Sequence, residues 1–270
     1  MKRVADTQSI EISRALETWY ARHHGAELRQ SLLTRLQPLL DLAFGYHVLQ
    51  LSPLQSSLID GSPINHKIFA SGCVNGEVSL CCHGDELPLE SDSVDMVVAW
   101  HALEFDAHPH GSLREMMRVL RPRGHLVIVG FNPFSLLGLS QRLRRFGSSE
   151  LWRRHHPVGL HRLTDWLHLV DGELESIQHL YPLPLSGQGR LWRISAGADR
   201  FFARHQLPGG GVYMAHALKQ IPGARRPRPV TAQAPARFAG LRVARSPTPT
   251  RRQDVQPARR AAPDQGDQAA

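Results

Sequence analysis

Three ionisable side chains stand at the ends of apolar segments, where a folded sheet can present them to a ligand. Asp85 follows the apolar run at 78–82, and His101 and Glu104 follow the apolar run at 94–100. A carboxylate at the carboxyl edge of a parallel sheet can accept hydrogen bonds from a ligand. An imidazole titrates near neutrality, so His101 is a candidate general base, and Glu104 is a second one. Each has a plainer alternative: a solvated turn for Asp85, a strand cap for His101, and the surface for Glu104.

The segment from Gly84 to Phe131 has the pattern of a strand, a helix and a second strand. Apolar and β-branched residues fill 94–100 and 125–129, as in buried strands. Between them lies a helical pattern, opened by Pro109 and closed by a basic turn at 121–124. Its apolar residues recur three and four positions apart: Leu113, Met116, Met117 and Leu120. Such a unit joins neighbouring parallel strands.

These residues resemble the class I S-adenosylmethionine-dependent methyltransferases, and most closely the branch typified by the quinone-biosynthesis C-methyltransferases. The resemblance rests on three motifs: Gly84-Asp85-Glu86-Leu87-Pro88-Leu89, Ser93-Val94-Asp95-Met96-Val97, and the segment from Leu113 through Glu115 and Arg118 to Gly124. It implies an α/β fold with a doubly wound, mostly parallel, seven-stranded Rossmann-like sheet that ends in an antiparallel hairpin. It also implies S-adenosylmethionine as the cofactor.

The resemblance assigns roles to particular residues. Asp85 would take the adenine amino group, and Glu86 and Leu87 would line the adenine edge through their backbone. Trp100 and His101 end the fourth strand, which faces the methionine end of the cofactor and the substrate.

The upstream motifs depart from the family. Its glycine-rich turn lets the backbone approach the cofactor, but here the strand at 46–51 runs into Ser52-Pro53. The strand at 67–70 is followed by Ser71, where the family has an acid for the ribose hydroxyls. If cofactor binding persists, we expect Gln50 and Ser52 to lie at the cofactor in place of the glycine-rich turn. The hydroxyls of Ser52 and Ser56 would then meet the methionine carboxylate, and Ser71 would take the place of the ribose acid.

Two functions of different classes are therefore expected. The first is a methyltransferase acting on a small-molecule acceptor, a reaction that needs no universal catalytic residue because the cofactor carries the reactive group. The second is a non-catalytic pseudo-methyltransferase, a binding or scaffold module that has lost the glycine-rich turn. A nucleic-acid-associated factor that uses the basic tail is a third hypothesis.

The chain divides into three parts by composition. We expect an N-terminal helical cap at 1–44 with a break at His24-Gly25, a methyltransferase domain at 45–220, and a disordered Arg/Pro/Ala-rich tail at 221–270. The tail holds ten arginines and three aspartates, so it carries +7 of the net charge of +8. It offers a surface for nucleic acid or an anionic membrane.

The remaining sequence features narrow the class of protein. No apolar run reaches the roughly 18 to 20 residues of a membrane helix, and no signal peptide is recognisable, so a cytoplasmic protein is expected. The three cysteines form no C-x-x-C pair, and no metal site is expected. Asn132-Pro133-Phe134 is interpreted as a turn. A basic cluster is interpreted as a solvated helix end: Arg153, Arg154, His155, His156 and His161.

Overall fold

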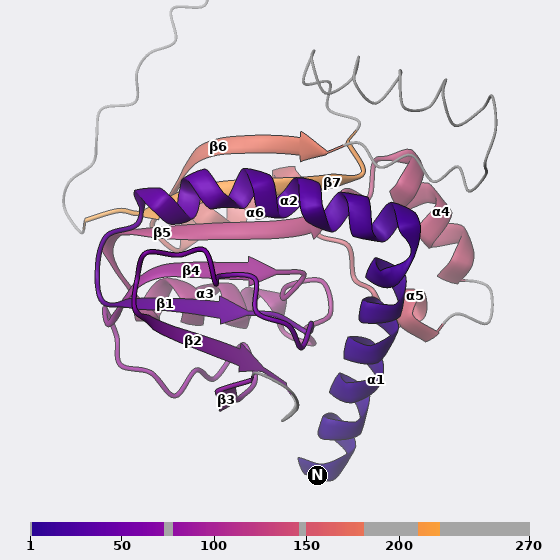
Figure 1. Ribbon diagram of the computed structural model, residues 1–270, viewed down its shortest axis with the longest axis horizontal. Coiled ribbons are helices and arrows are strands. Elements are labelled where there is room, and N and C mark those ends of the chain that lie inside the picture. Colours follow the sequence, from indigo (N-terminus) through magenta and orange to yellow (C-terminus); the bar gives the residue numbers. More distant parts are fainter. Residues whose placement is uncertain (1, 73–77, 146–149, 181–209, 222–270) are drawn as a thin grey trace, which may run out of the picture. The chain divides into compact units, whose positions relative to one another are not determined.

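The computed structural model describes residues 2–72, 78–145, 150–180 and 210–221 (Figure 1). The chain forms α1 (Lys2–Ala21), α2 (His23–Leu42), β1 (His47–Leu51), β2 (His66–Ser71), β3 (Leu80–Cys81), β4 (Val94–Trp100), α3 (Pro109–Val119), β5 (Leu120–Phe131), α4 (Leu136–Arg145), α5 (Glu150–Arg154), α6 (Leu160–Leu169), β6 (Gly172–Leu180) and β7 (Val212–Lys219).

The strands form one seven-stranded sheet in the order β3-β2-β1-β4-β5-β7-β6. Neighbours from β3 to β5 pair in parallel, whereas β7 runs antiparallel to both β5 and β6. The predicted fold class and the antiparallel final hairpin are confirmed. Because the parallel strands all point the same way, the loops after β1, β2, β3 and β4 meet at one edge of the sheet.

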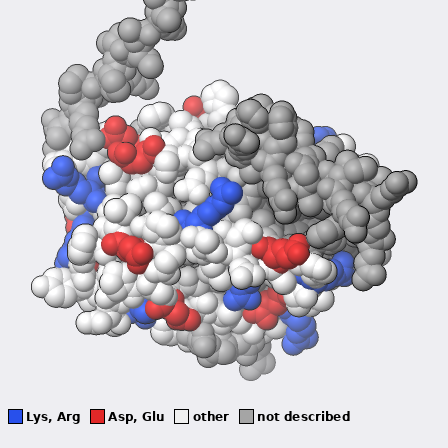
Figure 2. All heavy atoms as spheres, turned by 45° about the horizontal axis from the view of Figure 1, so that its top comes forward, with Lys and Arg blue, Asp and Glu red and all other residues white. Residues whose placement is uncertain are grey.

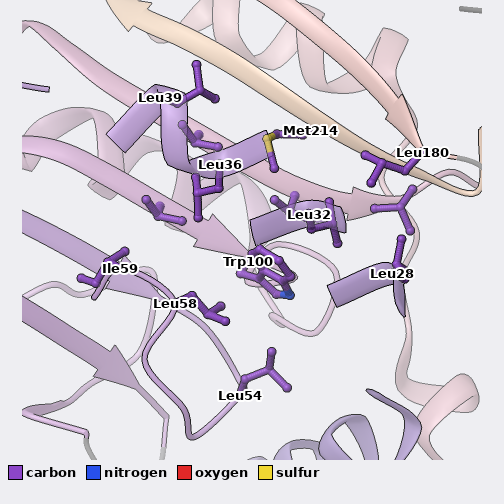
Figure 3. Close-up of a cluster of buried hydrophobic side chains, with 14 of the residues drawn as sticks. Leu28, Leu32, Leu36, Leu39, Leu54, Leu58, Ile59, Trp100, Leu180 and Met214 are labelled. Carbon is purple, nitrogen blue, oxygen red and sulfur yellow. The ribbon is translucent and has the colours of Figure 1, made fainter. Parts of the chain in front are cut away.

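The two faces of the sheet carry separate hydrophobic cores, since neighbouring residues of a strand point to opposite faces. On β4, Val98 and Trp100 pack with α2, whereas Val97 and Ala99 pack with α3 and α6. Figure 1 shows α2 across the near face and α3 and α6 behind the sheet. Figure 3 shows the leucines of α2 facing Trp100, Leu180 and Met214.

The connection from β1 to β2 departs from the usual α/β pattern, in which a helix joins neighbouring parallel strands. Residues 52–65 cross between these parallel strands without a helix. They bury their own apolar side chains, Leu54, Leu58, Ile59 and Ile64, in the core shared with α2. Gln50 fixes this loop, because its amide accepts from Leu58 N at 2.7 Å and donates to Ser56 O at 3.0 Å.

The opposite, amino end of the sheet explains the Ser93-Val94-Asp95 motif. The Asp95 carboxylate accepts from the backbone N of Tyr46 and His47 at 2.7 and 2.9 Å, and from Arg121 at 2.7 Å. Burial raises the pKa of Asp95, but these hydrogen bonds outweigh burial and hold the pKa below its ordinary value. Gly45 has φ +152°, and a Cβ there would collide with the same carboxylate.

Two predicted boundaries were wrong. The helical cap breaks at Arg22, between α1 and α2, rather than at His24-Gly25. The basic segment 121–124 is not a turn but part of β5, which pairs with β4 through a register shift between Val94 and Met96.

No helix among the described residues has the length and apolar content needed to cross a membrane. Figure 2 shows basic and acidic side chains interspersed over the visible face of the described residues.

Candidate functional site

A cavity of about 410 Å³ lies at the carboxyl edge of the parallel strands. Its lining comes from the ends of β1 and β2, from the loops after β3 and β4, and from α1, which contributes Gln8, Ser9 and Ile12. The volume is in the usual range for pockets that enclose a small ligand. Convergence of loops from successive strands makes this edge the natural ligand site of such a sheet.

Four of the predicted site residues line this cavity: Ser52, Ser71, Asp85 and Glu86. Ser52 follows β1, and its hydroxyl oxygen accepts from Leu54 N at 3.0 Å while its hydrogen can still be donated. Ser71 ends β2 and is almost fully buried. The Asp85 carboxylate is 28% exposed and lies 3.1 Å from Nδ1 of His108.

Close packing around Gly84 shapes the start of the Asp85 loop. A Cβ at Gly84 would lie 2.6 Å from both Asp106 Oδ2 and Ser112 Oγ. Ser112 Oγ donates to the same Asp106 carboxylate at 2.5 Å, so the start of α3 is fastened to the loop after β4. A side chain at position 84 would therefore have to displace the hydrogen-bonded pair of Asp106 and Ser112.

The helix motif with Glu115 and Arg118 holds the other side of the Asp85 loop. Arg118 donates to both carboxylate oxygens of Glu115 at 2.8 and 2.9 Å, and to the carbonyls of Leu87 and Leu89 at 3.0 Å each. The Glu115 carboxylate also accepts from Leu87 N at 3.3 Å. Hydrogen bonding to Arg118 lowers the pKa of Glu115, so the carboxylate stays charged. This ion pair positions the loop that carries Asp85.

The other predicted site residues are absent from the described lining of the cavity. Gln50 is fully buried and uses its amide on the 52–65 loop. Leu87 is 4% exposed and packs in the core beneath α3. Trp100 is fully buried in the core beneath α2, and His101 lies beside it.

His101 belongs to a buried chain of hydrogen bonds that begins on α1. Its Nε2 lies 2.6 Å from the Tyr20 hydroxyl, and its Nδ1 lies 2.6 Å from Glu104. The second oxygen of Glu104 accepts from Phe131 N at 2.5 Å. The imidazole stacks on the Phe131 ring, with centroids 4.1 Å apart and planes 16° apart. None of the four side chains is more than 2% exposed.

The chemistry of these groups determines which atom donates the proton in each hydrogen bond. An ionised carboxylate only accepts, so Nδ1–H of His101 donates to Glu104, and Nε2 accepts from Tyr20. Burial raises the pKa of Glu104, but hydrogen bonds from His101 and His155 outweigh it and hold the pKa below its ordinary value. Burial raises the pKa of Tyr20 far above its ordinary value, so the phenol keeps its proton.

The backbone of His101 is held in an unusual conformation. Its φ of +54° lies in the left-handed region, which costs free energy in a residue other than glycine. The backbone N donates to Val129 O at 2.9 Å, and both ring nitrogens are hydrogen bonded. These contacts keep a strained histidine at the end of β4.

Two interpretations of polar residues change with the structure. Glu104 is not a surface residue, because it is 1% exposed. His155 is not part of a solvated helix end either: it is 5% exposed, and its Nε2 lies 3.5 Å from Glu104, at the outer limit of a hydrogen bond. Asn132 accepts from Phe134 N at 3.0 Å, which agrees with the predicted turn.

The cysteines and histidines of the described residues show no metal site, because no three His, Cys, Asp or Glu side chains converge there. Cys81 is exposed and Cys82 is partly buried, and burial raises the pKa of the Cys82 thiol to about 11. An inert thiol is expected at that position.

Three functional contributions escaped the sequence interpretation. The spacing of the apolar residues around Tyr20 indicates only a helix face, and nothing in the neighbouring sequence shows where the Tyr20 hydroxyl points. Gln8 and Ser9 of the same helix line the strand-edge cavity, and the sequence does not show this either. The role of Glu115 and Arg118 could have been inferred, because acid and base three residues apart lie on one helix face.

A family model described as "Methyltransferase domain" matches residues 47–128. Among curated proteins, the Uncharacterized protein YafS of Escherichia coli (strain K12) is 29% identical over 181 residues, which is 65% of this chain and 72% of that protein.

A solved structure shares the fold. A chain from the complex between the Haloferax volcanii Trm112 methyltransferase activator and a methyltransferase superposes with a TM-score of 0.56 at 16% identity, over 78% of this chain and 98% of that chain. An S-adenosylmethionine-dependent methyltransferase from Thermotoga maritima matches with a TM-score of 0.49 at 16% identity, over 71% of this chain and 89% of that chain.

Proposed function

Because this chain belongs to the class I S-adenosylmethionine-dependent methyltransferase family, we propose that it binds S-adenosylmethionine in the strand-edge cavity and methylates a small-molecule acceptor. The observation that carries the proposal is the cavity itself. It gathers Ser52, Ser71 and Asp85 from the ends of three different strands, at the edge where a sheet of this topology binds its ligand.

The polar groups that line the cavity fit the adenosine and the methionine carboxylate of the cofactor. The partly exposed Asp85 carboxylate accepts from the adenine amino group, and Glu86 lines the same edge. Ser71 takes the place of the ribose acid, and Ser52 donates its remaining hydroxyl hydrogen to the methionine carboxylate. Gln50, Leu87 and Trp100 act indirectly, by fixing the loops and the core beneath the cavity.

When bound, the cofactor would supply a methyl group on a sulfonium: an acceptor atom bonds to the methyl carbon in line as the carbon–sulfur bond breaks, and S-adenosylhomocysteine leaves. The chain's own contribution is to exclude water and to hold the acceptor behind the methyl group. His101 can take a proton from an acceptor only after Tyr20 leaves Nε2 or passes the proton on, because that nitrogen already accepts from the phenol.

Specific observations favour a second candidate, a pseudo-methyltransferase that serves as a binding or scaffold module. Ser52 and Pro53 bring side chains to the cavity where the family has a glycine-rich turn, and no helix follows β1. Both candidate general bases are buried, since His101 is 0% and Glu104 is 1% exposed. This candidate predicts a folded protein that neither binds the cofactor nor turns over an acceptor.

Calorimetric titration of the full chain with S-adenosylmethionine and S-adenosylhomocysteine separates the two candidates. The methyltransferase proposal predicts binding of both, with one site per chain and micromolar dissociation constants. A folded protein that gives no heat with either molecule at millimolar concentration would overturn it and favour the scaffold. Fluorescence of the buried tryptophans, recorded before the titration, shows whether the sample is folded.

A nucleic acid or another anionic partner is a secondary proposal for residues 221–270, which carry +7 of the net charge. Counterion release predicts binding that weakens steeply with added salt. Deletion of these residues should abolish binding to a DNA duplex and leave the cofactor titration unchanged. Equal DNA affinity after deletion would contradict the proposal.

A further inference from the structure

A second and larger cavity, of about 610 Å³, lies among α4, α5 and α6. Gln141 and Arg142 reach it from α4, Trp152 from α5, and Arg162 from α6. His155, in the segment between α5 and α6, also lines it. Nothing in the proposed cofactor site requires this cavity, because the described linings of the two cavities share no residue.

Gln141 is the informative side chain of this second cavity. It is 3% exposed, and neither its Oε1 nor its Nε2 has a hydrogen-bond partner among the residues that the structure describes. Burying an amide without partners is unfavourable, and a leucine at the same helical position would avoid that cost.

Gln50 provides the matched comparison, since it is buried equally deeply. Its amide oxygen and nitrogen both find backbone partners, at 2.7 and 3.0 Å. Deep burial of glutamine in this chain is therefore compatible with full hydrogen bonding. The unpaired amide of Gln141 marks a site where a partner from outside the chain is expected.

The charge around the cavity indicates the sign of that partner. Arg142 and Arg162 contribute two positive charges to the lining, whereas its acid, Asp165, already faces His161 Nδ1 at 3.3 Å. An anion is favoured over a cation at such a site.

The apolar part of the lining indicates the chemical character of the rest of the ligand. Trp152 and Phe134 bring aromatic rings to the cavity, and Pro133 and Pro157 add apolar surface. Aromatic side chains favour a ligand that is itself flat and apolar.

We propose that the cavity among α4, α5 and α6 binds a small aromatic anion, a ring that bears a carboxylate or phosphate group, with Gln141 donating to the anionic group. Arg142 adds positive charge beside it, and Trp152 packs against the ring. The site is independent of methyl transfer, so it stands whether or not the strand-edge cavity binds its cofactor.

The test is saturation-transfer NMR and calorimetry on the full chain with benzoate, phenyl phosphate and neutral benzyl alcohol. We expect benzoate or phenyl phosphate to bind at least tenfold more tightly than benzyl alcohol, both with and without S-adenosylhomocysteine. The two anions distinguish a carboxylate ligand from a phosphate ligand.

Two variants and a control locate the binding. Gln141→Leu keeps the size of the side chain and should weaken binding of the anion tenfold or more, with a melting temperature no lower than that of the parent. Arg142→Ala, at an exposed position, should also weaken it. Arg114→Ala removes an exposed arginine of α3 outside the cavity and should bind as the parent does.

Three results would overturn the proposal. They are no binding of either anion at millimolar concentration, equal binding of benzyl alcohol and the anions, or unchanged anion affinity in Gln141→Leu. If Gln141→Leu failed to fold, unchanged affinity in Arg142→Ala would overturn it instead.

Discussion

The Tyr20 hydroxyl donates to Nε2 of His101 across 2.6 Å, between residues 81 positions apart in the chain. This bond fastens α1 to the end of β4, and Glu104 continues the chain of hydrogen bonds to the end of β5. Since α1 also forms one wall of the strand-edge cavity, the same bond holds that wall in place.

Replacing Tyr20 with Phe tests this bond. The variant leaves Nε2 of His101 buried without a partner, and we expect a loss of about 1–3 kcal/mol in the free energy of unfolding, measured by urea denaturation. Tyr46→Phe is the control, because Tyr46 is 73% exposed and should change stability by less than about 0.5 kcal/mol. Equal midpoints for Tyr20→Phe and the parent would mean that the bond contributes nothing.

Replacing Asp85 with Asn tests the adenine assignment. A charged acceptor is exchanged for a neutral amide, so binding of S-adenosylhomocysteine should weaken by about 1.5–3 kcal/mol, roughly ten- to a hundredfold in Kd. Glu90→Gln changes an exposed acid in the same loop that is not among the described cavity lining, and it should bind normally. The assignment is lost if the two variants bind equally well.

The Glu115–Arg118 ion pair predicts a pH dependence of stability. The pKa of Glu115 is lowered in the folded protein, first by the hydrogen bond to Arg118. Stability from this carboxylate is therefore present above its unfolded pKa and is lost as the pH falls through the folded pKa. Glu115→Gln should lower the free energy of unfolding by about 1–3 kcal/mol at pH 7. Between pH 7 and acid pH, the variant should lose less of its free energy of unfolding than the parent.

Urea denaturation from pH 7 to pH 3 measures the effect, with the more exposed Glu27→Gln as the control. Parallel pH profiles for Glu115→Gln and the parent would refute the assignment to this residue.

His216 predicts a second pH window, at a higher pH. It lies against His125 on the paired strand, with Nε2 and Nδ1 3.0 Å apart, and burial together with His125 lowers the pKa of His216 to about 4. Burial also lowers the pKa of His125, whereas Glu175 opposes that shift. The unfolded chain thus binds the proton first, and stability falls as the pH drops from about 6.5 to about 4.

Between about pH 6.5 and about pH 4, we expect His216 to lower the free energy of unfolding by about 3 kcal/mol. His216→Gln should flatten the fall in unfolding free energy across this window, whereas His161→Gln, at a side chain 92% exposed, should not. A slope that persists in His216→Gln would assign the protons elsewhere.

Much of the fold could be predicted, because a buried parallel strand is recognisable from a short run of neighbouring apolar residues. The apolar run of β4 and the helical spacing of α3 each identify an element from a few neighbouring residues. The loop at 52–65 could not be predicted, because its course depends on Gln50 and on the leucines of α2, which it meets only after folding.

The candidate site divides in the same way. Ser52 directly follows β1, Ser71 ends β2, and Asp85 lies in the loop after β3. They reach the cavity because the ends of these strands are recognisable in the sequence and lie at one edge of the sheet. The buried network was not predictable, since Tyr20, His101 and His155 come together from distant segments. The position of Glu104 after β4 is local information, but its burial is not.

The position of α2 determines how the protein must fold. Its leucines pack against Leu180 of β6 and Met214 of β7, so the first long helix of the chain completes its core only when the last strands arrive. Such contacts between distant parts of a sequence slow folding and bind early and late segments into one cooperative transition. A fragment that ends before β7 would leave the apolar face of α2 uncovered, and no N-terminal part of the sheet is expected to be stable alone.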